Sequence, residues 1–417
     1  MKNMRYIGTI SGDILPVSIE GVGYYLNQNY DVQNIIDMVN NSIIAPRFRI
    51  FILYNDETIR YEIPAEDLKS GSGSYNENYQ NGQRKSVSFA LYNEHRKYST
   101  GINGLWAGTR VRLDLGYEMQ SGETIWIEKG IFVINKITPK YSNSETIIEI
   151  TASDKFSLFE NKTGTLESTY EIPVGSNVQQ LIQSILCADM GNGIAFDIKD
   201  IVYHSSFKDK VTQVTISKSA GDTYGSILLD IATQLSAEIF YNSTGNLTIV
   251  PITNVVDDIN KPIIFDFDTA KGDMTNLDLS FDLDSIVNRV IVIGSSSSGG
   301  VYQAIAVNEE PASPLNAKRI GYRTGSIIND SNITSDILAQ ERAQYELRQQ
   351  LILKSSSNVN ISFNPLLSVN NLITITDETY GLKKERFLIQ SLSYNIGYEG
   401  SMSMTISNLN NLPFLIK

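Results

Sequence analysis

The sequence holds little of the material from which catalytic and metal centres are built. Its 417 residues include one cysteine, Cys187, and two histidines, His95 and His204. A single cysteine cannot form an internal disulfide, and Cys187 lies in an apolar-periodic segment that predicts a small buried core residue. The histidines lie in polar, loop-like contexts that predict solvated side chains. These features exclude thiolate metal sites, Cys–His catalysis and any centre built on clustered histidines.

Long apolar runs and an excess of positive charge are also missing. No run of about 18 apolar residues occurs, which excludes a transmembrane helix, and the N-terminus lacks the apolar core of a secretory signal. We therefore expect a soluble protein made in the cytoplasm. The net charge of −12 argues against a surface that holds nucleic acid or anionic membrane, although DNA could pass an acidic surface without binding.

Motifs for phosphate binding or acyl transfer are absent as well. The GxG at 191–193 follows a predicted helix, and the GSSSSGG at 294–300 lacks the Lys-Ser/Thr ending of a phosphate loop. No GxSxG occurs. A glycosidase would need only two carboxylates, and the candidates are Glu123, Glu128, Asp257, Asp258, Glu309 and Glu310. None of them stands out from an ordinary acidic surface, so no catalytic, metal or cofactor-binding residue is assigned and no cofactor is expected.

The strand pattern predicts a mainly β protein with α+β insertions. Residues 46–165 contain short alternating segments with small polar turns, which indicate a first β-barrel module. Within it, the Gly/Ser/Asn-rich segment 69–83 predicts a long exposed loop, and Trp106 and Trp126 are expected in the core. Residues 1–45 are treated as an N-terminal arm.

Helical periodicity appears in the middle of the chain. Residues 166–260 combine two amphipathic helices with a hairpin, so we predict an α/β domain in which Asp222 caps the second helix. Residues 261–300 and 355–417 return to alternating strands and form the predicted second β-barrel module. Residues 301–354 form an insertion with one long helix, about 334–353, capped by Thr334. The predicted architecture is thus two similar small β-barrel modules flanking an α/β layer.

Two stretches of the chain look like copies of one strand-turn-strand unit. Residues 132–154 align with residues 387–408. The aligned apolar positions, which predict equivalent core residues, are Phe132 with Phe387, Ile134 with Ile389, and Ile137 with Leu392. Two copies of one module are typical of rings, adaptors and scaffolds. The alternative is chance similarity between two amphipathic hairpins. If the repeat is real, each copy should close one barrel and the two barrels should superpose.

An acidic stripe follows one predicted strand. In residues 276–284, leucines and a phenylalanine alternate with polar residues, so Asp278, Asp282 and Asp284 share one face. Same-face neighbours are about 6.6 Å apart, too far to share one metal ion. The stripe is either a solvated face or the lining of a wet channel that keeps a passing polyanion from sticking.

The order of these elements resembles the baseplate hub proteins of phage tails, which are similar to the late-control protein D group and to the hub module of type VI secretion spikes. The segments that carry the resemblance are 130–154, 221–252, 285–294 and 385–408. The resemblance implies a homotrimer whose six barrel units form a pseudo-sixfold ring. That ring would join the tail tube to a central spike or fibre.

The same resemblance implies the partners and the location. The partners would be the tail tube protein, the tape-measure protein and the spike or other baseplate proteins, with DNA passing through the lumen without specific binding. The protein would assemble in the host cytoplasm, reside in the virion tail and have no enzymatic activity. Two alternatives stay open: a tail-associated cell-wall hydrolase using unassigned carboxylates, and a glycan-binding β-rich adhesin, which Trp106 and Trp126 would serve if exposed.

Overall fold

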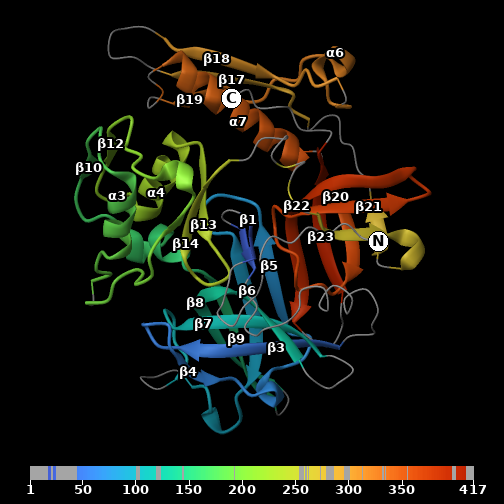
Figure 1. Ribbon diagram of the computed structural model, residues 1–417. Coiled ribbons are helices and arrows are strands. Elements are labelled where there is room, and N and C mark those ends of the chain that lie inside the picture. Colours follow the sequence, from blue (N-terminus) through green and yellow to red (C-terminus); the bar gives the residue numbers. More distant parts are fainter. Residues whose placement is uncertain are drawn as a thin grey trace.

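The computed structural model describes residues 17–19, 22–24 and 45–409, except for 100–103, 119–123, 143–144, 192, 253–257, 259–260, 262, 273, 279–285, 295–300, 312, 331–332, 334, 355 and 397–400. The described part is mainly β, as predicted, and its largest element is a 13-stranded sheet (Figure 1). A two-stranded hairpin, β1 (Val17–Ile19) with β2 (Val22–Tyr24), precedes it. Most of the predicted 1–45 arm lies outside the described residues.

The first module lies at the bottom of Figure 1 and consists of antiparallel strands. Its elements are β3 (Ala45–Leu53), β4 (Ile59–Glu62), η1 (Ala65–Asp67), β5 (Gly73–Asn78), β6 (Lys85–Tyr92), η2 (Glu94–Arg96), β7 (Arg110–Glu118), β8 (Thr124–Ser142) and β9 (Glu145–Asp154). Alternation in β3 places Ile50 and Ile52 in the core.

The α/β layer follows, at the left of Figure 1. Its elements are α2 (Ser157–Glu160), η3 (Lys162–Gly164), β10 (Tyr170–Ile172), α3 (Val178–Leu186), β11 (Val202–Tyr203), η4 (Ser205–Phe207), β12 (Ile216–Lys218), α4 (Tyr224–Gln234), β13 (Ala237–Tyr241) and β14 (Leu247–Pro251). Both predicted helices are present. The cap of α4 is Thr223, whose side chain accepts a hydrogen bond from the Ser226 amide, and not the predicted Asp222.

The second module is interrupted by the insertion. The module contains β15 (Ile263–Asp268), η5 (Thr269–Lys271), β16 (Met274–Asp278), β20 (Ser356–Ser362), β21 (Leu372–Asp377), β22 (Leu382–Ile396) and β23 (Ser401–Asn408). The insertion contains β17 (Arg289–Gly294), β18 (Gln303–Val307), α6 (Ala317–Ile320), β19 (Ile328–Asp330) and the long helix α7 (Asp336–Lys354). Strand β17, which the sequence pattern assigned to the second module, pairs instead with β18 and β19. The predicted cap Thr334 lies outside the described residues.

The predicted repeat is present in the strand pairing. Phe132 of β8 pairs with Asp154 of β9, and Phe387 of β22 pairs with Asn408 of β23. The register of each hairpin shifts at the same point, after Ile134 in the first copy and after Ile389 in the second. A bulge at one matched position is a specific backbone feature that chance similarity between amphipathic strands does not explain.

The two copies also share the turn that enters the preceding strand. Gly108 donates to the Ile134 carbonyl, and Asn370 donates to the Ile389 carbonyl. Gly108 has φ 89° and Asn370 has φ 63°, and glycine and asparagine are the residues that tolerate this left-handed region best. Similarity therefore extends from residue 108 to 154 and from 370 to 408. One hydrophobic cluster holds Phe132 and Phe387 together.

The strands of both modules form one continuous sheet. Its order runs β16-β20-β23-β22-β5-β6-β9-β8-β7-β3-β4, with β21 and β15 attached beside β22. The strand that joins the modules is β5, which pairs with β6 on one side and with β22 on the other. The prediction of an exposed loop over 69–83 is therefore wrong. Tyr75 and Glu77 of this segment are 0% and 3% exposed, because strands from both modules cover them.

Three smaller predictions are also wrong. Trp106 is 58% exposed and Trp126 is half-buried, so neither belongs to the core proper. Cys187 is exposed at the end of α3, because it follows the last residue of the helix rather than occupying its apolar stripe.

Candidate assembly surface

The junction of the two modules is built first from backbone pairing. Strand β22 runs antiparallel to β5, with Leu392 opposite Glu77 and Tyr394 opposite Tyr75. The Asn78 amide donates to the Arg84 carbonyl on the β6 side, whereas the next amide, Tyr79, donates to the Gln390 carbonyl on the β22 side. This alternation makes Tyr75–Tyr394 a hydrogen-bonded pair of the ladder.

Aromatic side chains fill the core beneath this junction. The rings of Tyr75 and Tyr394 stack with centroids 4.8 Å apart, and Phe132 meets Tyr75 edge-on at 6.2 Å. Phe363 of the second module meets Tyr394 edge-on at 5.7 Å. Burial raises the pKa of Tyr75 well above its usual value, and the neighbouring Glu77, to which the Tyr75 hydroxyl donates at 3.1 Å, raises it further. The two modules therefore share one desolvated core.

Lys129 of β8 ties the first module to a turn of the second. Its Nζ donates to the carbonyls of Pro365 at 3.0 Å and Leu367 at 2.8 Å. The side chain is fully enclosed, and burial lowers the pKa of Lys129 to about 8. The two carbonyl dipoles stabilise the ammonium of Lys129, but they do not offset the whole free-energy cost of removing it from water.

This burial predicts a specific pH dependence of stability. Between about pH 8 and the unfolded value of about 10.4, Lys129 is neutral in the folded chain and still protonated in the unfolded chain. The unfolded state then binds more protons, so the free energy of unfolding should rise with pH across this window. Burial lowers the pKa of Lys85 and Lys155 as well, so denaturant titrations at pH 7.5 and 9.5 should show a smaller rise for Lys129→Met than for the native chain. Replacing the exposed Lys136 with methionine is the matched control and should leave the pH dependence as it is in the native chain.

A buried charge cluster fastens the first module to the α/β layer. Lys155, which follows β9, donates to Asp197 at 2.8 Å and also to Glu57. The Tyr241 hydroxyl of β13 donates to Asp197 at 2.8 Å, and Arg110 of β7 pairs with Glu57 at 3.2 Å. These five side chains are almost completely buried. Such a cluster fixes geometry, since each charge depends on its partners for solvation.

Helix α7 is anchored in the same way. Arg348 pairs with the buried Asp258, which Lys261 also meets at 2.7 Å. Arg84 of the first module pairs with Glu238 of β13 at 2.7 Å, and the Tyr79 hydroxyl donates to the same carboxylate. Buried ion pairs thus join α7 to the segment before β15, and the first module to β13.

Part of the sheet face opposite the core, which also carries Lys136, Lys140 and Glu149, is lined by small uncharged polar residues. Cross-strand pairing places them side by side across both modules, for example Asn76 beside Ser393 and Asn358 beside Thr405. All are exposed or half-buried: Ser74, Asn76, Ser86, Ser88, Thr151, Asn358, Asn360, Ser391, Ser393, Ser403 and Thr405. We name this set the polar face. Sequence reasoning missed it, although the alternating serines of the segments at 86–92, 391–396 and 401–407 were a visible signal.

The predicted site residues fall in two groups. Phe132, Ile134, Phe387, Ile389 and Leu392 are buried in the shared core. Ile137 packs against it, partly buried. Of the acidic stripe, Asp278 is exposed on β16, and its carboxylate accepts a hydrogen bond from Asn276 at 2.8 Å. Asp282 and Asp284 lie outside the described residues, as do the carboxylate candidates Glu123 and Asp257.

The other carboxylate candidates do not converge. Glu128 pairs with Arg112 at 3.2 Å, Asp258 is held by Arg348 in the interior, and Glu309 is exposed beyond β18. Among the described residues, no group of His, Cys, Asp and Glu side chains could hold a metal ion. In the same part of the chain, no helix is long and apolar enough to cross a membrane.

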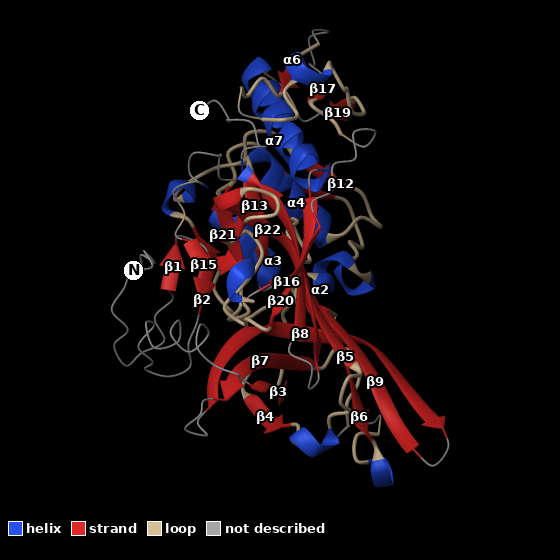
Figure 2. Ribbon diagram, turned by 90° about the vertical axis from the view of Figure 1, so that its right-hand side faces the viewer, coloured by secondary structure: helices blue, strands red, loops and turns tan. Residues whose placement is uncertain are grey.

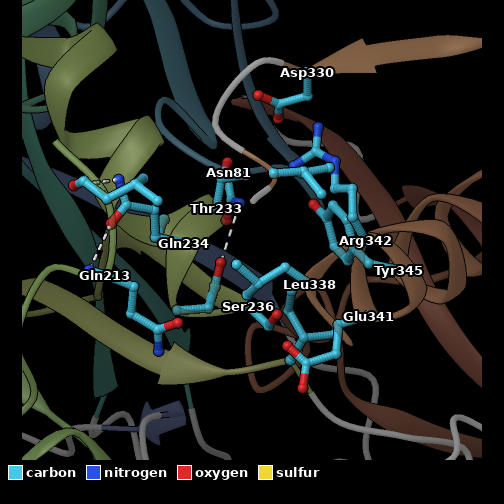
Figure 3. Close-up of a pocket in the computed structure, with 15 residues that line it drawn as sticks. Asn81, Gln213, Thr233, Gln234, Ser236, Asp330, Leu338, Glu341, Arg342 and Tyr345 are labelled. Carbon is cyan, nitrogen blue, oxygen red and sulfur yellow. Dashed lines mark hydrogen bonds between the residues drawn. The ribbon is translucent and has the colours of Figure 1, made fainter. Parts of the chain in front are cut away.

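A small pocket lies between α4 and α7 (Figure 3). Thr233 and Gln234 come from α4, and Arg342 and Tyr345 from α7. Gln234 accepts a hydrogen bond from the Gln213 amide at 3.2 Å, which closes one side. The volume of about 50 Å³ is far below the roughly 300–1,000 Å³ of typical small-molecule sites, so the pocket suits a few water molecules.

Comparison with known proteins points to one structural group. No protein-family model matches the sequence, and no curated protein is similar to it in sequence. The fold matches the 43 kDa tail protein of prophage MuSo2 from Shewanella oneidensis, with a TM-score of 0.60 and 15% identity over 88% of this chain and 99% of that one. The tail protein from Neisseria meningitidis MC58 matches with a TM-score of 0.61 and 10% identity, over 87% and 98% of the two chains.

A chain of a PdpA-VgrG complex shares the fold as well. The Francisella PdpA-VgrG complex contains a chain that matches with a TM-score of 0.53 and 9% identity, over 90% of this chain and 60% of that one. The resemblance to phage tail and secretion-spike proteins that the order of elements indicated is therefore confirmed for the fold.

Proposed function

We propose that this protein is a structural hub of a phage tail or tail-like particle. In this role three copies form a pseudo-sixfold ring that joins the tail tube to a central spike or fibre. The observation that carries the proposal is the repeat: two modules with one register, one bulge and one left-handed turn sit side by side in a continuous sheet. Three such chains present six similar positions, which matches a sixfold tube, and retain threefold symmetry for a spike.

The polar face suits the wall of the lumen. Serine, threonine and asparagine hold water without fixed charge, so neither a tape-measure protein nor DNA would adhere while passing. Asp278 lies on the same face and adds repulsion toward a polyanion. We place this face toward the lumen, and the tube, tape-measure and spike proteins against the ends of the ring.

A non-enzymatic role agrees with the described residues. The carboxylates that a wall hydrolase would need lie apart or in ion pairs, and the small pocket holds no convergent acid and base. Function then depends on interface area and on rigidity, and the buried ion pairs contribute to the rigidity. The protein would act in the virion tail after assembly in the host cytoplasm.

The test measures assembly directly. Light scattering of the purified chain should give the mass of a trimer, and electron microscopy after mixing with the tube protein of the same particle should show rings seated on tube ends. A chain that stays monomeric at all concentrations and does not decorate tubes would overturn the proposal. Peptidoglycan zymography on the same sample should show no clearing.

A further inference from the structure

Lys155 places a nucleophilic amine in the interior of the molecule. It follows β9, where the chain passes from the first module into the α/β layer, which lies above the strands of that module in Figure 2. The residue is 0% exposed. Burial lowers the pKa of Lys155, which favours the neutral amine. A lysine amine that has lost its proton is a nucleophile for carbonyl and carboxyl carbons.

The carboxyl group of Asp197 lies directly against this amine. Lys155 Nζ is 2.8 Å from Oδ1 and 2.7 Å from Oδ2 of Asp197. Cγ, the carbon between these oxygens, is therefore in contact with the nitrogen. Asp197 is also 0% exposed, and the two residues are 42 positions apart in the sequence. Two groups held in contact by the fold have the high effective concentration that an amide condensation requires.

Glu57 brings a second carboxylate to the same amine. Its Oε1 accepts a hydrogen bond from Lys155 Nζ, and its side chain is 3% exposed. Its Oε2 is buried and accepts no hydrogen bond of normal geometry, although the Lys199 ammonium lies 2.8 Å away. A carboxylate in contact with the donor on one oxygen, with lone pairs free on the other, can accept a proton and pass it on.

The backbone around Glu57 is held in an unusual conformation. Glu57 has φ 64°, in the left-handed region that a residue with a side chain seldom adopts. Arg110 donates to the Asn55 carbonyl at 2.7 Å and to the Phe196 carbonyl at 2.9 Å, so one guanidinium positions both loops that carry the carboxylates. Strained backbone that surrounding contacts maintain is found most often at functional sites.

Two hydrogen-bond donors point at the oxygens of Asp197. The Tyr241 hydroxyl donates to Oδ2 at 2.8 Å, and the Lys199 amide donates to Oδ1 at 3.0 Å. Attack on a carboxyl carbon places negative charge on its oxygens, and fixed donors stabilise that charge. The cluster therefore combines a nucleophile, a proton carrier and a carboxyl group with donors on both of its oxygens.

We propose that Lys155 and Asp197 condense to an intramolecular isopeptide bond after the chain has folded. Lys155 Nζ forms a bond to Asp197 Cγ, and the bond from Cγ to one carboxyl oxygen breaks. Glu57 carries two protons in turn from the nitrogen to that oxygen, which leaves as water. An ammonium and a carboxylate are thereby converted into one amide and one water molecule, so atoms and charge balance without a further reactant.

Burial favours the amide over the ion pair from which it forms. Hydration stabilises a separate ammonium and carboxylate in water, but these two groups are removed from water by the fold, and that removal is costly. The amide is neutral. Its N–H can donate to Glu57 and its oxygen can accept from Tyr241, so the product stays hydrogen-bonded. Asn55 and Asp56, in the turn that carries Glu57, are exposed, so the released water has a short path to solvent.

The bond changes how the α/β layer is attached to the first module. It joins the end of β9 to the loop that follows α3, and α2, β10 and α3 then lie within a covalent ring. Force along the chain passes through the cross-link and cannot extract these elements, and the unfolded chain loses conformational freedom. Both residues belong to one copy, so the bond forms whether or not the copies assemble.

The mass of the intact, denatured chain tests the bond. The native chain should be lighter than its sequence mass by one water molecule, whereas Lys155→Met and Asp197→Ala should have the full sequence mass. Asp197→Asn should lose one ammonia in place of water, which a purely structural role does not produce. Glu57→Gln should slow condensation by about 100-fold or more, seen as the full sequence mass in a freshly purified sample.

Lys218 and Asp230 provide a matched control. Their ion pair is 2.8 Å long, but both side chains are partly exposed, so Lys218→Met should keep the mass loss. Trypsin should cleave after Lys218 and not after Lys155, and should release a branched peptide that contains Lys155 and Asp197. A native chain that retains its full sequence mass overturns the proposal, and so does a mass loss that persists in Lys155→Met. Because the native chain decides the first result, a variant that fails to fold leaves the test intact.

Discussion

Replacing Phe132 or Phe387 with alanine is expected to lower the free energy of unfolding by about 3–5 kcal/mol in each case. The two side chains are 0% and 2% exposed and occupy the same position of two copies of one hairpin. Truncation leaves a cavity in the core that the modules share, and the flanking strands cannot close over it without breaking their pairing. Equilibrium denaturation of the purified variants would measure both losses.

The comparison between the two positions is the sharper part of this experiment. Phe132→Leu and Phe387→Leu serve as matched controls, since they keep most of the apolar volume and should cost clearly less than alanine. Ser88→Ala, on the polar face, should change stability by about 0.5 kcal/mol or less. A large loss at one phenylalanine with less than about 1 kcal/mol at the other would show that the copies do not play equivalent structural roles.

Replacing Asp197 with alanine should destabilise the chain by about 3–5 kcal/mol, because it removes one member of a buried charge cluster. Asp197 is 0% exposed and receives hydrogen bonds from Lys155, Tyr241 and the Lys199 amide. Without it, the ammonium of Lys155 stays buried beside Glu57 alone. The free energy of unfolding, measured by denaturant titration at neutral pH, gives the loss.

A double variant separates this explanation from simple loss of packing. Lys155→Met combined with Asp197→Ala removes the stranded charge together with its partner, so it should be less destabilised than the sum of the single variants. Asp200→Ala, an exposed neighbour on the same loop, should stay within about 0.5 kcal/mol of the native chain. Additive losses in the double variant would contradict an electrostatic origin of the destabilisation.

Local patterns predicted much of this fold because local physics decides it. The alternation of Phe132, Ile134 and Ile137 continues in Phe387, Ile389 and Leu392, and one side of each hairpin is buried. Amphipathic periodicity likewise predicted two helices within residues 166–260, where α3 and α4 lie. In these segments the apolar pattern and the tertiary environment agree.

Strand β5 could not be predicted in this way. Its glycine, serine and asparagines favour turns, and only Tyr75 is a strong strand former in the segment Gly73–Asn78. The strand exists because β6 and β22 pair with it from both sides, and its partners in β22 lie more than 300 residues away. Tertiary pairing overrides local preference in this strand. The alternating serines of the polar face are visible in the sequence, but the sequence does not show which strands lie side by side.

The position of β5 also has a consequence for biosynthesis. The bond from Ser393 to Asn76 spans 317 residues, so one side of β5 has no partner until almost the whole chain has left the ribosome. The first module and the α/β layer can fold earlier, since their pairings are closer in sequence, and long-range closure is the slow step in such topologies. A nascent chain truncated before residue 391 would carry an unsatisfied strand edge. Completion of β22 is therefore the event that converts this polypeptide from an aggregation-prone intermediate into a unit ready for assembly.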